Sequence, residues 1–280
     1  MKFSHYELYD LINRPGPLWL ANADLSDAHL RGANLRRYIL SGANLSKAIL
    51  NNADLSEAEL SDANLSESIM MEANLNKSIM VKADLTGANL GGSNLSEANL
   101  GSAKLSHASM NDTNLRDANL RGAKLVRVNL NKANLYGVNL GGADLNEARL
   151  VDVNMRDAKC VKANMGGASF VDSNLQDADL SRAILLGANL TRTNLTRADL
   201  SEANLANASL NDADLSHANL SKADLRGASF FSANLCNANL SGANLLNAVL
   251  DKVKYNASTV WPDDFDPQTA DMVLLQNEPS

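Results

Sequence analysis

The chain has 280 residues, a formal net charge of −7 and 4% aromatic residues. Nucleic-acid binders need a basic stripe with interleaved aromatic side chains, so this composition argues against that class. No segment approaches the roughly 20 consecutive apolar residues of a membrane span, which argues against a membrane protein. Two cysteines and the lack of an apolar leader at the first residues favour a cytoplasmic location over secretion.

Residues 1–17 lie outside the repeat that follows and are expected to form an N-terminal capping segment. Ser4 and Glu7 have the spacing of a capping box, which predicts a short helix over residues 4–13. Pro15-Gly16-Pro17 then ends any helix. A cap is needed because the first layer of a repeat fold exposes apolar side chains and an unpaired strand edge.

A period of five residues dominates the chain from Leu20 to Leu250. Every fifth position in this stretch, the central position of a repeat, is apolar, and the register never slips. Most central residues are Leu; the others are Met70, Met80, Met110, Met155, Met165, Phe170, Phe230 and Cys160. Ala usually stands two residues earlier, so the unit is A-(N/D)-L-x-x, as in residues 43–47. A fixed period is the signature of a repeat architecture.

Five residues per repeat fits neither a continuous helix nor a flat strand. In a helix the apolar row would wind around the axis, and in a flat sheet successive central side chains would point to opposite faces. The remaining solution turns a corner in every repeat and points each central residue and each Ala inward. This predicts a buried core that includes the central residues Leu45, Leu125, Leu205, Phe170 and Phe230.

The unbroken series resembles the pentapeptide-repeat family over residues 18–250. The resemblance implies an all-β fold, a right-handed quadrilateral β-helix with four pentapeptides per coil, and a single repeat domain over residues 18–257. Positions 20 residues apart would then lie directly above one another. Tyr38 stands where the repeat has Ala, one coil above Leu18, and is expected to add bulk to the core near the N-terminal cap. The alternative is a Tyr38 side chain that swings outward.

Two groups of outward residues are candidate partner-binding sites. Ile49 and Ile69 stack one coil apart with Met71 nearby, although stacked aliphatics also simply stabilise neighbouring strands. The second group is an acidic cluster, for which a solvated mixed-charge face is the alternative because Arg156 and Lys132 lie among the acids. Its members are Asp152, Asp157, Asp172 and Asp177.

After Leu250 the rhythm breaks, and residues 258–280 are expected to form a C-terminal capping tail. Its order of Trp-Pro, Phe and Pro resembles the closing segment of cyanobacterial pentapeptide-repeat proteins, which implies that Trp261 and Phe265 cover the last Leu layer. Asp266 is predicted to cap a short helix whose apolar face is residues 272–275. This helix packs on the last coil or pairs two molecules, so the chain is expected to be a monomer or an end-to-end dimer.

The sequence offers no constellation for catalysis. The four histidines are scattered, and Gly91-Gly92 falls at a corner position rather than in a phosphate-binding loop. We therefore expect no enzyme activity, no cofactor, no metal and no small-molecule substrate. The predicted function is a protein-protein interaction scaffold, regulatory in some relatives, with an unidentified protein partner.

The alternative is a DNA mimic, because certain family members bind or protect DNA gyrase. Mimicry needs dense, continuous negative charge. Residues 258–280 carry a net charge of −5 and residues 1–17 carry none, so residues 18–257 retain only −2 of the total −7. The repeat surface is thus close to neutral, which favours the scaffold.

Overall fold

The computed structural model describes residue 10, residues 16–269 and residues 271–275. The chain divides into two compact units, Met1–Asp144 and Leu145–Ser280, and each is described by itself. Apart from Asp10, the helix predicted over residues 4–13 lies outside the described residues.

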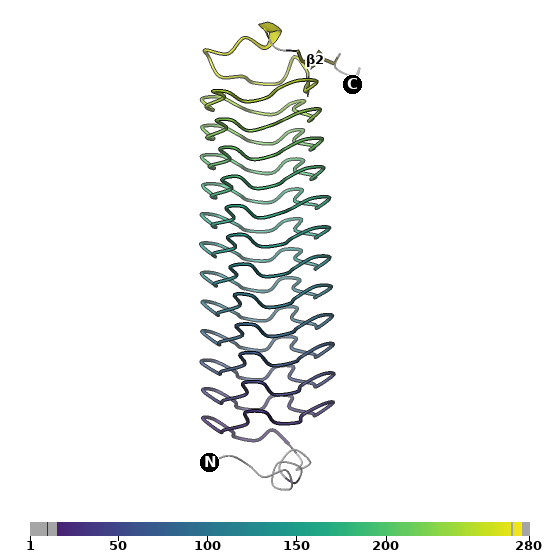
Figure 1. Ribbon diagram of the computed structural model, residues 1–280, viewed down its shortest axis with the longest axis vertical. Helices are drawn as coiled ribbons and strands as arrows, with labels where there is room; N and C mark the ends of the chain where they lie inside the picture. The colour runs from purple at the N-terminus through teal and green to yellow at the C-terminus, as the bar shows by residue number, and fades with distance from the viewer. Residues whose placement is uncertain (1–9, 11–15, 270, 276–280) are drawn as a thin grey trace. The chain divides into compact units, whose positions relative to one another are not determined.

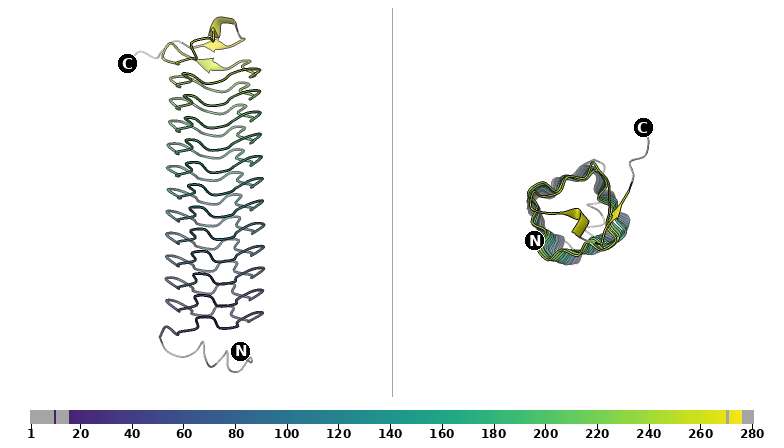
Figure 2. Two further views of the ribbon diagram at one scale, coloured as in Figure 1. Left: turned by 90° about the vertical axis from the view of Figure 1, so that its left-hand side faces the viewer. Right: turned by 90° about the horizontal axis from the view of Figure 1, so that it is seen from above.

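In both units the backbone winds into stacked coils of 20 residues. The residue before each central position forms a parallel bridge with the residue 20 positions further on, for example Asn44 with Asn64 in the first unit and Asn174 with Asn194 in the second. Four such bridging positions fall in each coil, so each coil has four faces (Figure 1; Figure 2). Each unit is therefore a β-helix solenoid made of four pentapeptides per coil.

A tight turn at every corner explains why the repeat has five residues. In the turn after Leu40, the Ala43 N–H donates to the Leu40 carbonyl at 2.9 Å. The third residue of this turn, Gly42, has a φ of 66°, and Lys47 has a φ of 58° at the same position of the next turn. A positive φ at this point is the hallmark of a type II turn, which here turns the chain from one face of the coil to the next. Successive central side chains can therefore all point to the axis.

The core of each unit consists of the central residues with the Ala residues between them. The five central residues singled out in the sequence are completely buried: Leu45, Leu125, Phe170, Leu205 and Phe230. Tyr38 lies inside, with 3% of its surface exposed, and its burial raises the pKa of the phenol. Cys160 is buried and Cys236 half-buried, and both are free thiols.

The C-terminal tail continues the β-ladder and does not form the predicted helix. Strand β1, Lys254–Tyr255, pairs in parallel with β2, Val273–Leu274, and a single 3₁₀ turn, η1, spans Pro267–Thr269. The predicted apolar helix face over residues 272–275 is therefore wrong. The physical reason is the open edge of β1, whose carbonyls need donors: the Leu275 N–H donates to the Tyr255 carbonyl at 2.7 Å.

Two other expectations for the tail concern its aromatic residues and its cap. The Trp261 ring contacts the rings of Tyr255 and Phe265, at centroid distances of 5.6 and 5.0 Å. The Asp266 carboxylate accepts a hydrogen bond from the Gln268 N–H at 2.9 Å, as an N-cap does, although only a 3₁₀ turn follows. The aromatic side chains thus pack at the end of the second unit.

Candidate functional site

Where an Asn or Asp precedes the central residue, its side chain holds the following turn in place. The Asn44 Oδ1 accepts a hydrogen bond from the Ser46 N–H at 3.2 Å, which forms an Asx turn. It also accepts one from the Asn64 Nδ2 at 3.3 Å, one coil further on. These bonds fix the two turn residues that follow, which project from the corner of the coil. The sequence pattern alone suggested only that these Asn and Asp residues were polar and outward.

The second turn residue at each corner has a special backbone conformation that was anticipated only where Gly occupies it, as in Gly91-Gly92. Its φ is positive in almost every repeat, whether it is Gly, Asn, Asp or a longer charged residue such as Lys132, with a φ of 62°. The frequent Gly, Asn and Asp two residues after the central Leu are the signal that sequence analysis had for it. These corner residues and the bridging residues form the accessible surface of each unit.

Ile49, Ile69 and Met71 form a small apolar patch on the first unit. Ile49 and Ile69 are bridged to each other, with His29 bridged to Ile49 on one side and Asn89 to Ile69 on the other. Ile69 is 38% exposed and Met71 43% exposed, whereas Ile49 is half-buried. The structure thus brings the three predicted residues together on one side of the coils, bounded by polar neighbours.

The acidic residues predicted as a docking cluster lie in the second unit, and two of them are engaged by arginines. Arg192 binds Asp172 through two hydrogen bonds of 2.6 and 2.7 Å. Arg197 binds Asp177 in the same way at 2.7 and 2.8 Å. These bidentate contacts lower the pKa of both carboxyl groups.

Arg156 engages the acids at the neighbouring corner. It lies 3.6 Å from the Asp157 carboxylate and 3.7 Å from that of Asp177. Asp152 is exposed and forms no ion pair among the described residues. Three of the four predicted acids therefore have cationic partners within the same unit, which leaves little unpaired negative charge for docking.

Ion pairs one coil apart recur at the corners of both units. Arg182 binds Glu202 at 2.9 Å, and Lys77 lies 3.5 Å from Glu97. Arg36 and Arg37 both bind Glu57, and their hydrogen bonds lower the pKa of this carboxyl to about 2. The 20-residue coil places opposite charges within reach of each other, so charge is neutralised locally along the corner columns.

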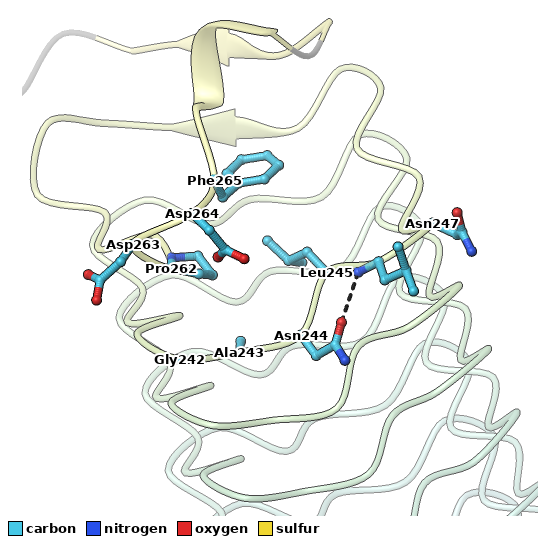
Figure 3. A pocket seen from close by; sticks show the side chains of 10 residues that line it. Gly242, Ala243, Asn244, Leu245, Asn247, Pro262, Asp263, Asp264 and Phe265 are labelled. Carbon is cyan, nitrogen blue, oxygen red and sulfur yellow. Dashed lines mark hydrogen bonds between the residues drawn. The ribbon is translucent and has the colours of Figure 1, made fainter.

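A pocket of about 750 Å³ lies at the C-terminal end of the second unit (Figure 3). Residues 242–247 of the last coil line one side, and residues 262–265 of the tail line the other. The ring of Phe265 and the carboxylate of Asp264 lie above the coil that carries Leu245 (Figure 3). This pocket was not predicted, although the break in the repeat after Leu250 marks its place.

The described residues hold neither a metal-ligand cluster nor a membrane-spanning helix. They contain no group of three His, Cys, Asp or Glu side chains arranged to hold a metal ion. Nor does any helix among them have the length and apolar character needed to cross a membrane.

The family model described as pentapeptide repeats matches this chain in eight copies, over residues 20–56, 39–76, 53–92, 93–131, 133–172, 173–212, 193–230 and 228–254. The chain belongs to the pentapeptide-repeat family. Proteins of this family are generally non-enzymatic structural or interaction proteins. A comparison with curated proteins found no match.

Three solved pentapeptide-repeat structures resemble the chain. HetL, which is involved in heterocyst differentiation regulation in the cyanobacterium Nostoc sp. strain PCC 7120, is 33% identical over 81% of this chain and 91% of HetL, with a TM-score of 0.48. The protein alr5209 from Nostoc PCC 7120 is 40% identical over 36% of this chain and 84% of its own, with a TM-score of 0.36. QnrB1, a plasmid-mediated fluoroquinolone resistance protein, is 17% identical over 94% and 91%, with a TM-score of 0.27.

Proposed function

We propose that this pentapeptide-repeat protein is a non-catalytic scaffold that binds a protein partner through outward side chains of its coils. We further propose that it acts in the cytoplasm and has a regulatory role. The 33% identity to HetL, a protein involved in the regulation of differentiation, supports the regulatory role. The two free thiols support a reducing compartment.

The observation that carries the proposal is the patch of Ile49, Ile69 and Met71. The backbone under it is held on both sides: the Ile69 N–H donates to the Ala48 carbonyl at 2.9 Å, and the Asn52 N–H donates to the Met71 carbonyl at 2.9 Å. A pre-organised apolar surface loses little conformational entropy on binding, so a small patch gives more affinity on this frame than on a loop. Its polar surroundings fit the rim of an interface.

The paired charges favour this scaffold over a DNA mimic. A duplex carries one negative charge about every 1.7 Å, and a mimic must reproduce that density. Along the corners of this chain, carboxylates such as Asp172 and Glu202 are bound by arginines one coil away. A supercoiling assay tests the alternative directly: unchanged DNA gyrase activity at micromolar protein is the expected result, and inhibition or protection would favour mimicry.

The scaffold is tested by capture of partners from native extract with the full chain as bait. Ile69→Asp and Met71→Asp should each reduce the captured partner at least tenfold, because either change places a charge in an apolar contact. Ile79→Asp is the matched control, since Ile79 is also an outward bridging Ile, 41% exposed, in the same unit. Equal loss with all three variants, or with none, would contradict a contact at this patch.

A further inference from the structure

We propose that the C-terminal end of the second unit binds a short basic peptide in extended conformation, which adds a strand over the last coil at Asn244 and Val249. The site uses residues of the second unit alone, whereas the apolar patch belongs to the first unit. Failure of one proposal therefore leaves the other standing.

The first observation is an open β-ladder on two of the four faces. Asn234 and Asn239 are each followed by a further bridge, to Lys254 and Val260. Asn244 and Val249 bridge only to the preceding coil, and no bridge to a following strand is formed among the described residues. Half of the last coil therefore ends in a strand edge that is unpaired among the described residues.

The hydrogen-bonding groups of this edge are those that a parallel strand would use. In the coils below, the N–H after each bridging residue donates to the next coil, as Leu240 does to the Val260 carbonyl at 2.7 Å. The equivalent N–H groups of Leu245 and Leu250 have no acceptor among the described residues. Likewise, the Ala243 carbonyl has no donor there. An extended peptide adds to such an edge by main-chain hydrogen bonds.

The second observation is the pocket above this edge. Leu245 is not buried, unlike every other central residue from Leu20 to Leu250, all of which the structure describes. It lines the 750 Å³ pocket together with Phe265, and Leu246 beside it is 63% exposed. An apolar side chain of the added strand fits between Leu245 and Phe265, where the next central residue of a further coil would lie.

The charges around the edge select a basic peptide. Asp263 and Asp264 line the pocket, and Asp251 and Asp271 line an adjoining hollow of about 330 Å³. The residues that line the two spaces include no Lys or Arg. Lys or Arg side chains at the outward positions of the added strand would face these carboxylates. A second copy of the chain is a poorer occupant, because docking end to end would bring two acidic rims together.

The probe is a fluorescein-labelled ten-residue peptide, Lys-Ala-Lys-Leu-Lys-Lys-Ala-Lys-Leu-Lys, that carries the spacing of the repeat. Its counterpart has Glu in place of each Lys. Fluorescence anisotropy with the full chain at low salt should show that the basic peptide binds at least tenfold more tightly than the acidic one. Equal affinities, or no binding of either, would overturn the proposal.

Variants at exposed positions test the placement without threatening the fold. Asp263→Lys combined with Asp264→Lys should reverse the preference, so that the acidic peptide binds more tightly. Leu246→Ser, which removes apolar surface without adding charge, should weaken the basic peptide at least fivefold. Asp62→Lys, at an exposed corner of the first unit, is the charge control and should change affinity less than twofold. Loss of binding in the control to the same extent as in the double variant would refute the site.

Hydrogen exchange distinguishes strand addition from contact through side chains alone. The amides of Leu245 and Leu250 should exchange at least tenfold more slowly in the complex, whereas the Leu240 amide, already bonded to Val260, should not change. Binding without this protection would overturn strand addition. A concentration-dependent dimer that Leu246→Ser abolishes would assign the edge to a second copy of the chain and also overturn the proposal.

Discussion

Truncation of Leu45 to Ala tests the central feature of the fold, the stacked apolar axis. Leu45 is completely buried, and the central residues one coil away on either side, Leu25 and Leu65, are buried as well. Leu→Ala changes in packed cores cost about 2–5 kcal/mol, and the cost rises with the cavity that remains. The ladder holds the coils apart, with the Leu45 N–H 2.6 Å from the Asn64 carbonyl, so the site cannot collapse freely. We therefore expect a loss near the upper end, about 3–5 kcal/mol.

Urea denaturation followed by far-ultraviolet circular dichroism measures this loss as a change in the free energy of unfolding of the full chain. Leu245→Ala is the comparison variant and should cost less, about 1–2 kcal/mol, because Leu245 is already partly exposed at the last coil. Leu45→Met should cost less than about 1.5 kcal/mol, since Met fills central positions such as Met70. Equal losses for Leu45→Ala and Leu245→Ala would refute the buried axis.

Three further predictions concern single positions. Ser93→Ala should stabilise the protein by about 1 kcal/mol, because the buried Ser93 hydroxyl has no hydrogen-bond partner among the described residues. Ser78→Ala should instead cost about 1 kcal/mol, because it loses a 2.7 Å bond to a backbone carbonyl. Denaturant midpoints compare the two variants. Gly92→Ala should destabilise the protein by about 1–2 kcal/mol, because Gly92 has a φ of +68°. Gly91 does not have a positive φ, so thermal melting of Gly91→Ala should show a much smaller change. The pKa of Glu57 is about 2 in the folded protein against an ordinary 4.5, so the ion pair should stabilise the fold above pH 4.5 and lose this effect as the pH falls towards 2. The melting temperatures of Glu57→Gln and the parent protein should therefore converge over that range. A difference in melting temperature that stays constant with pH would contradict the ion pair.

The periodicity alone predicted which side chains point inward, because one apolar position in five fits neither a helix nor a flat strand. The 20-residue coil came from the family resemblance, and the bridges have that spacing. Ion pairs such as Arg192 with Asp172 were not predicted, because they depend on side-chain rotamers at two corners as well as on register. The predicted tail helix was wrong for another reason. Asp266 and Pro267 are good local signals for the start of a helix, but Val273 and Leu274 pair as a strand with the open edge of β1.

Recognition by this fold is expected where the repeat departs from its own pattern. Regular repeats satisfy their polar groups internally, through Asx turns, amide ladders and ion pairs one coil apart, so a regular face offers a partner few unsatisfied groups. Ile49 and Ile69 replace the usual Asn or Asp and thereby expose apolar surface in place of an Asx turn. At the last coil, Asn244 keeps its Asx bond to the Leu246 N–H, but the ladder above it is missing. The patch at Ile49 and Ile69 supplies an apolar contact, and the unpaired edge at Asn244 supplies main-chain hydrogen bonds. A partner that used both would have to present an apolar surface to the first unit and an extended basic segment to the second.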